Sequence, residues 1–167
     1  VKNVTRFYYE GNEAKAAGLY DAMSSSVTRR DSLTGSVLSK TYYYTGYGKG
    51  DEIANYTENY KIDGTSIKNV TKFFYADNEA QDAGLYDAMN YSITYKDDLM
   101  TTALSRTVYS VVFGKGDEIA DYTENFKNDG STIKNVTRFY YADKLASAAG
   151  LYDAMTYSIT TKDSLNG

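Results

Sequence analysis

Apolar and polar residues alternate with a period of two along much of the chain, which predicts β-strands. The alternation is clearest in segment 88–96, where every second residue is large and apolar: Met89, Tyr91, Ile93 and Tyr95. Segment 119–127 repeats the pattern, with Ala120, Tyr122 and Phe126 on one predicted face. Such alternation is typical of antiparallel sheets with one drier and one wetter face.

The predicted strands recur at a constant interval of about 66 residues, within the range of tandem repeats. Segment 18–23 returns unchanged at 84–89 and again at 150–155. A weaker half-period divides each unit, which predicts one array of five half-repeats of two types in the order A-B-A-B-A. The A units span 1–35, 67–101 and 133–167, and the B units span 36–66 and 102–132.

Two strands per half-repeat predict an all-β fold, an antiparallel β-hairpin meander of about ten strands. Asp63-Gly64 and Asp129-Gly130 indicate tight hairpin turns, because glycine adopts positive φ readily. Segment 12–18 and its counterparts 78–84 and 144–150 leave room for two helical turns at most.

A flat strip of ten strands is disfavoured because strands twist. We therefore expect the strip to curl into a solenoid-like or barrel-like form, or to pack on a second copy. A β-propeller is the alternative, since one 66-residue unit holds four strands, but two and a half such units cannot close a ring.

Both ends of the predicted strip are unprotected strand edges. The chain contains no proline, and neither terminal unit diverges from the inner ones as capping repeats normally do. The chain also begins inside a repeat, so we expect a processed product or a fragment. The expected partner is therefore self: either the repeat continues in a longer chain, or copies add edge to edge into a filament.

Composition narrows the function classes. The chain has 19 Tyr but no His and no Cys, which removes the commonest general base, the thiolate nucleophile and the usual metal ligands. We expect no enzyme activity, no cofactor and no bound metal. A net charge of -4 with scattered Lys and Arg argues against nucleic-acid binding. No apolar run is long enough for membrane insertion.

Two sets of carboxylates recur with the repeat. Asp51-Glu52 and Asp117-Glu118 follow Gly-Lys-Gly and allow either a calcium loop or a solvated turn. Their spacing matches no calcium-binding motif, which favours the turn. The other set recurs once in each A unit, which suggests a structural role at a strand start, and consists of Asp21, Asp87 and Asp153.

Two features of the sequence could involve sugars: sequons and rows of aromatic residues. Sequons for possible N-glycosylation occur at Asn3, Asn55, Asn69, Asn90 and Asn135. Exposed aromatic rows can also stack on sugar rings, and the candidate stacking residues are Tyr8, Tyr43, Phe74, Tyr109 and Tyr140. Cross-strand aromatic pairing that stabilises the sheet is the favoured alternative for these aromatics.

Two segments carry a family resemblance: 19–23 (LYDAM) and 60–75 (YKIDGTSIKNVTKFFY). They resemble the tyrosine–aspartate (YD, RHS-type) β-hairpin repeats of large bacterial surface and secreted proteins. Met23 stands near a position where that family has a turn glycine. The resemblance implies an extracellular, repetitive and non-enzymatic role. We therefore expect a structural protein at the cell surface, a filament or surface-fibre subunit. The alternative is an adhesin segment whose Tyr-rich sheet faces bind carbohydrate.

Overall fold

The computed structural model describes residues 2–164, which form a single sheet of 13 strands. The ten long strands are β1 (Asn3–Tyr9), β3 (Met23–Arg30), β4 (Val37–Tyr44), β5 (Ile53–Tyr60), β6 (Ile67–Tyr75), β8 (Met89–Tyr95), β9 (Ala103–Ser110), β10 (Ile119–Phe126), β11 (Ile133–Tyr141) and β13 (Met155–Lys162). The short elements are strands β2 (Asn12–Glu13), β7 (Asn78–Glu79) and β12 (Lys144–Leu145), and the 3-10 turns η1 (Ala14–Ala16) and η2 (Ala146–Ala148).

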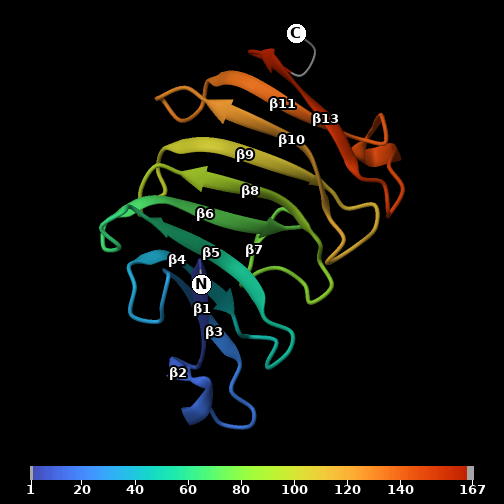
Figure 1. Ribbon diagram of the computed structural model, residues 1–167. Helices are drawn as coiled ribbons and strands as arrows, with labels where there is room; N and C mark the ends of the chain where they lie inside the picture. Colours follow the sequence, from blue (N-terminus) through green and yellow to red (C-terminus); the bar gives the residue numbers. More distant parts are fainter. Residues whose placement is uncertain (1, 165–167) are drawn as a thin grey trace.

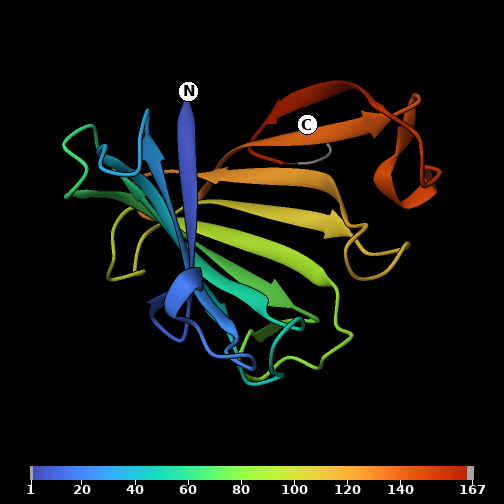
Figure 2. The ribbon, with the colours of Figure 1, turned by 60° about the horizontal axis from the view of Figure 1, so that its bottom comes forward.

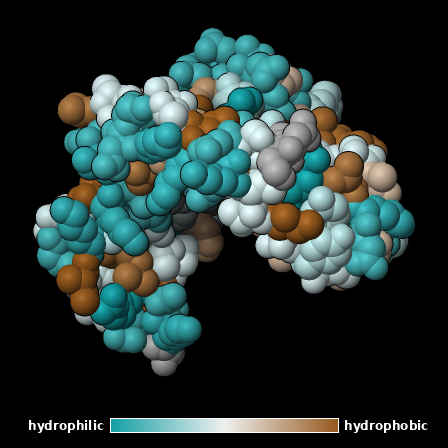
Figure 3. Space-filling view, turned by 90° about the horizontal axis from the view of Figure 1, so that it is seen from above, coloured by the Kyte–Doolittle hydropathy of each residue, from teal (hydrophilic) through white to brown (hydrophobic). Residues whose placement is uncertain are grey.

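Each inner long strand pairs antiparallel with the long strands before and after it along the chain, and β1 and β13 each pair with one. The predicted all-β meander of hairpins is therefore confirmed. The strip curls into an open arch with β1 and β13 at opposite ends (Figures 1 and 2). The register shifts by one residue within every pair of adjacent long strands, and such β-bulges increase the local twist. Seen from above, the arch is hollowed on one side (Figure 3).

The meander places all long loops on one border of the strip and all short turns on the other. The long loops follow the first strand of each hairpin and lie on the right and at the bottom of Figure 1. The predicted turns at Asp63-Gly64 and Asp129-Gly130 join consecutive hairpins, and their glycines have φ of 69° and 74°. Segment 12–18 forms only one 3-10 turn, Ala14–Ala16, because Asn12 and Glu13 pair in β2 and the backbone is already extended at Ala17.

The two faces of the sheet differ in chemistry. On the threonine face, each hairpin contributes one hydrogen-bonded hydroxyl pair of 2.8–3.0 Å, and the pairs are Thr5–Thr28, Thr41–Thr57, Thr71–Thr94, Thr107–Thr123 and Thr137–Thr160. The aromatic face carries stacked ring pairs with centroids 4.5–4.6 Å apart: Tyr42–Tyr56, Phe74–Tyr91 and Tyr140–Tyr157. The prediction that cross-strand aromatic pairs hold the sheet together agrees with these stacks.

The core consists of small clusters beneath the long loops. In the middle A unit, Ala80 and Ala83 of the loop pack against Tyr75 of β6 and Ile53 of the preceding B unit. The third A unit repeats this cluster with Tyr141, Ala146 and Ala149, packed beside Ile119. The second and third A loops therefore gain their core from the B hairpin that precedes each of them.

The predicted alternation is wrong for Met89. It groups Met89 with Tyr91, but a bulge at Asn90 pairs Met89 with Tyr75 while Tyr91 remains opposite Phe74. Met89 consequently packs into the cluster under the loop, whereas Tyr91 stacks on the aromatic face. A bulge in β10 separates another predicted pair in the same way, Ala120 and Tyr122.

Candidate functional site

The two open edges of the sheet are the candidate site. Strand β13 pairs with β11 on one side only, and β1 pairs with β3 on one side and with the two residues of β2 at the end of the other. Unpaired backbone N–H and C=O groups on such edges accept a further strand readily. The exposure of each edge strand can be compared with that of its repeat equivalents, because those inner strands pair with a long strand on both sides.

Strand β13 is the third copy of β3 and β8, and it is much more exposed than either. Ser158 is exposed, whereas its equivalents Ser26 and Ser92 are only 8% and 6% exposed. Ile159 is 46% exposed, and its equivalent Ile93 is half-buried. The difference arises because β4 covers β3 and β9 covers β8, while no described strand covers β13.

Three contacts attach each B hairpin to the A unit before it. The N–H of Met89 donates to the Glu118 carboxylate at 2.9 Å, and the Lys115 ammonium donates to the Leu85 carbonyl at 2.6 Å. The hydroxyls of Ser92 and Tyr109 lie 3.1 Å apart. The first A–B junction has the same contacts at 2.7, 2.7 and 3.3 Å: Met23 to Glu52, Lys49 to Leu19, and Ser26 to Tyr43.

The ionised form of Glu52 is stabilised at the first A–B junction. Partial burial of Glu52 opposes its ionisation, but hydrogen bonds from the N–H groups of Met23 and Gly50, together with nearby Lys49, outweigh it. The pKa of the Glu52 carboxyl is therefore lowered, so the group is ionised at neutral pH. The Gly-Lys-Gly-Asp-Glu loop, which the sequence predicted to be a solvated turn, holds neighbouring hairpins together through its Lys and Glu.

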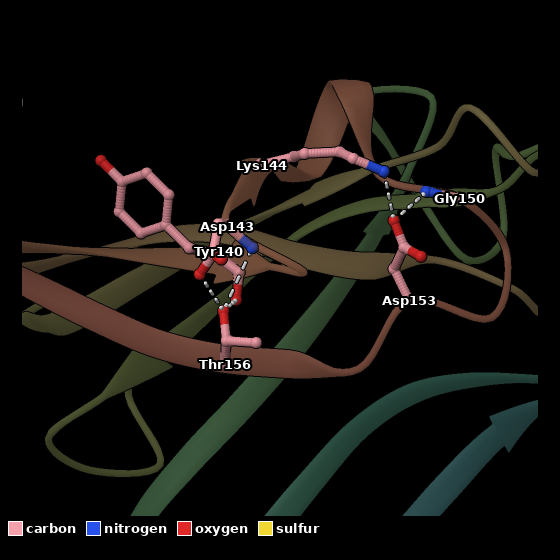
Figure 4. Close-up of polar contacts among 6 residues, drawn as sticks. All are labelled: Tyr140, Asp143, Lys144, Gly150, Asp153 and Thr156. Carbon is pink, nitrogen blue, oxygen red and sulfur yellow. Dashed lines mark hydrogen bonds and ion pairs between the residues drawn. The ribbon is translucent and has the colours of Figure 1, made fainter.

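The third A unit has the same local structure as the inner two, although its junction contacts have no partner among residues 2–164. Its loop is closed by the Gly150 N–H, which donates to Asp153 at 2.8 Å, and Lys144 donates to the same carboxylate oxygen (Figure 4). The hydrogen bond from Gly150, then that from Lys144, lowers the pKa of the Asp153 carboxyl. Equivalent bonds join Gly18 to Asp21 and Gly84 to Asp87, so these aspartates have the structural role that the sequence predicted.

At the opposite edge, the side chains of the first A unit are also more exposed than their equivalents inside the array. Val70 and Val136 pair with the preceding B hairpins and are 0% and 1% exposed, whereas their equivalent Val4 is only half-buried. Ala14 is exposed, although its equivalents Ala80 and Ala146 are fully buried. Both ends of the array therefore present surfaces that are covered elsewhere in the same molecule.

The candidate sugar-stacking residues do not form one site. Tyr8, Phe74 and Tyr140 lie on the aromatic face, where two of them already stack on cross-strand partners. Tyr43 and Tyr109 lie on the threonine face and contact serine hydroxyls. All five side chains are half-buried.

The sequons differ in accessibility. Asn3 is exposed, while Asn69 and Asn135 are half-buried and accept hydrogen bonds from Asn59 and Asn125 at 2.8 Å. The two other sequon residues are also half-buried; the Oδ1 atom of Asn55 is buried, and Asn90 donates to Asp77.

The sequence analysis missed the most exposed aromatics. Tyr20, Tyr86 and Tyr152 are 84%, 86% and 93% exposed and occupy equivalent positions in the three A loops. The sequence signal for their exposure is their place in the identical segments 18–23, 84–89 and 150–155, which lie outside the alternating segments. Period-two alternation is a property of strands, so it carries no information on these loop residues.

No catalytic or metal-binding constellation stands out among residues 2–164. This part of the chain contains no group of three or more acidic side chains placed to hold a metal ion. A groove of about 400 Å³ lies on the aromatic face, and its described lining includes Tyr8, Lys40 and Tyr60 but no carboxylate. None of the helical segments in residues 2–164 has the length and hydropathy needed to cross a bilayer.

Comparisons with protein families, curated proteins and solved structures give no match to this chain. The resemblance to tyrosine–aspartate repeats stays a prediction.

Proposed function

We propose that this chain is a non-enzymatic structural segment of an extracellular or cell-surface fibre. It takes up further β-hairpins at the open edges of β1 and β13. The observation that carries the proposal is the third A unit, which is folded like the inner copies although no strand among residues 2–164 covers its outer edge.

The length and the exposed apolar side chains of β13 support strand addition at this edge. Strand β13 is eight residues long, and Tyr157 and Ile159, both over 40% exposed, alternate along it. Natural edge strands are usually protected by proline, bulges or inward-pointing charges, because a long apolar edge pairs with other chains. The chain has no proline, and a charge occurs in β13 only at its last residue, Lys162. The one bulge in β13 lies at Thr156, and the strand pairs regularly beyond it, from Tyr157 to Lys162.

Sedimentation velocity and electron microscopy of the purified chain test the proposal. We expect association that increases with protein concentration and produces unbranched fibres. Ile159→Lys should weaken association, because it places a charge on the open edge. Ile62→Lys is the matched control, since Ile62 is 79% exposed in a turn between two paired strands and the substitution adds the same charge. A chain that remains monomeric at the highest soluble concentration would rule out self-assembly.

A carbohydrate-binding adhesin is a second candidate, favoured by the exposed loop tyrosines Tyr20, Tyr86 and Tyr152. Aromatic rings with a polar tip suit a surface that is both wet and apolar, such as a sugar ring. Binding on a glycan array that is lost in the triple Tyr→Ala variant would favour this function. Retention of binding in that variant, or its absence in the parent chain, would count against it.

A further inference from the structure

We propose that the open edge of β13 is a binding site specific for a B-type hairpin, the kind formed by residues 36–66 and 102–132. The inference rests on the proposed function and names its partner. It distinguishes this partner from the other strand that a second copy offers, which is β1.

The recognition chemistry is visible twice inside the molecule. A B hairpin brings a carboxylate to a strand N–H, an ammonium to a loop carbonyl and a phenol to a serine hydroxyl. The third A unit presents the same three groups in the same order: the Met155 N–H, the Leu151 carbonyl and the Ser158 hydroxyl. Hydrogen bonds that involve a charged group are stronger and more directional than neutral ones, so two of the three contacts discriminate between partners.

The aromatic face offers a fourth point of recognition. At the covered copy, the Arg106 guanidinium of the B hairpin lies 4.4 Å from the ring centre of Tyr91. Tyr91 is stacked from its other side on Phe74. Tyr157 has the corresponding stack on Tyr140, at 4.6 Å and 15°, and is 42% exposed. A cation from an incoming B hairpin would cover Tyr157 as Arg106 covers Tyr91.

The binding surface is already formed. The loop before β13 is closed by the bond from Gly150 to Asp153, and Thr156 bonds to the Tyr140 carbonyl and to Asp143 (Figure 4). A site that needs no ordering of its own loses less conformational entropy when a partner binds.

Strand β1 of a second copy cannot provide the same contacts. The loop after β1 turns back at once to form β2, which pairs with β1 through Tyr8 and Glu13. The Glu13 carboxylate is already engaged by Arg6 and Lys15 of its own unit. The β1 strand of a second copy can pair with β13 through its backbone, but without the three junction contacts it is the weaker partner.

The direct test adds a synthetic peptide of residues 102–132 to the full chain. We expect saturable binding and slower hydrogen–deuterium exchange at the outward amides of β13, Met155 included. The control peptide carries Lys115→Ala and Glu118→Gln, which preserve its length and net charge. We expect it to bind at least about tenfold more weakly, because two charge-assisted hydrogen bonds are lost.

A linked version covers the case in which the peptide does not fold alone. A copy of residues 102–132 placed after residue 167 continues the repeat in phase, and a copy of residues 1–31 at the same place imitates addition of a second chain's β1. The first extension should protect β13 from exchange more strongly than the second. Equal protection by both extensions, or no protection by the first, would overturn the inference.

The outcomes separate this inference from the proposed function. If the unmodified chain stays monomeric but the B copy protects β13, the specificity holds and self-assembly of this chain fails. If the unmodified chain forms fibres while β13 gains no protection from the B copy, the specificity fails alone.

Discussion

Single carboxylates fix the turns between consecutive hairpins. Asp63 is hydrogen-bonded by the Ser66 hydroxyl and by the N–H groups of Thr65 and Ser66, which lowers the pKa of its carboxyl to about 2. Asp129 has the equivalent partners, first among them Thr132, and its pKa is also lowered to about 2. The glycine that follows each aspartate has the positive φ that the turn requires, which glycine adopts at no steric cost.

Replacing both aspartates by asparagine should change the acid sensitivity of the protein. A depressed pKa in the folded state stabilises the fold fully above the unfolded value of about 4, and this contribution is lost as the pH falls through about 2. Urea unfolding between pH 7 and pH 2 should show a shallower loss of stability below pH 4 in Asp63→Asn/Asp129→Asn than in the parent. Parallel curves would contradict the assignment.

The junction carboxylate should contribute measurably to stability. Glu118→Gln removes the charge from the acceptor of the Met89 N–H, and we expect unfolding free energy to fall by about 1 kcal/mol. Asp117→Asn is the matched control, because it removes the same charge from the neighbouring residue, which is exposed. Chemical denaturation of the two variants measures the difference, and equal losses would remove the special role of Glu118.

At the scale of strands, the stacked aromatic pairs join neighbouring elements. Phe74–Tyr91 lies inside the array, with Arg106 of β9 over Tyr91, whereas Tyr140–Tyr157 lies at the open end. The two stacks have nearly the same geometry, and only the inner one is flanked by a further hairpin. A comparison of the two therefore isolates the effect of that hairpin.

Truncating the two equivalent tyrosines should therefore have unequal effects. Tyr91→Ala loses a stack, a cation–π contact and half-buried area, for which we expect a cost of about 2 kcal/mol. Tyr157→Ala loses a more exposed ring, for which about 1 kcal/mol is expected. Denaturant unfolding measures the loss of unfolding free energy in each variant. A larger loss for Tyr157→Ala would contradict the expectation that the adjacent hairpin strengthens the inner stack.

At the scale of the whole molecule, each hairpin contacts only its neighbours along the arch. Stability in such arrays is close to a sum of unit and junction contributions, so units with one junction are weaker than units with two. The most deeply buried side chains agree: Val70 and Val136 pair with preceding hairpins, and the equivalent Val4 does not.

Native-state hydrogen exchange at low protein concentration should reveal a gradient along the arch. We expect the slowest amides in β6 and β8 of the middle A unit and the fastest strand amides in β13. Uniform protection of all ten long strands would show that the array unfolds as one cooperative unit.

Much of the fold could be predicted from local signals. The 66-residue recurrence, the period-two strands and the Asp-Gly turns predicted the meander, because hairpin pairing depends on residues close together in sequence. Met89 could not be placed, since a single bulge residue reverses the face of everything beyond it. The junction role of Glu52 was also out of reach, because its partner Met23 lies 29 residues away across a strand boundary.

By itself, the amino-acid sequence determined the strands, their order and the identity of the repeating units, since alternation and turn chemistry are local properties of the backbone. Only the tertiary structure decided which face each ring occupies and how the arch curls. It also revealed which contacts remain open at its ends. Those features depend on bulges and on pairings between neighbouring hairpins, and they exist only once the strands lie side by side.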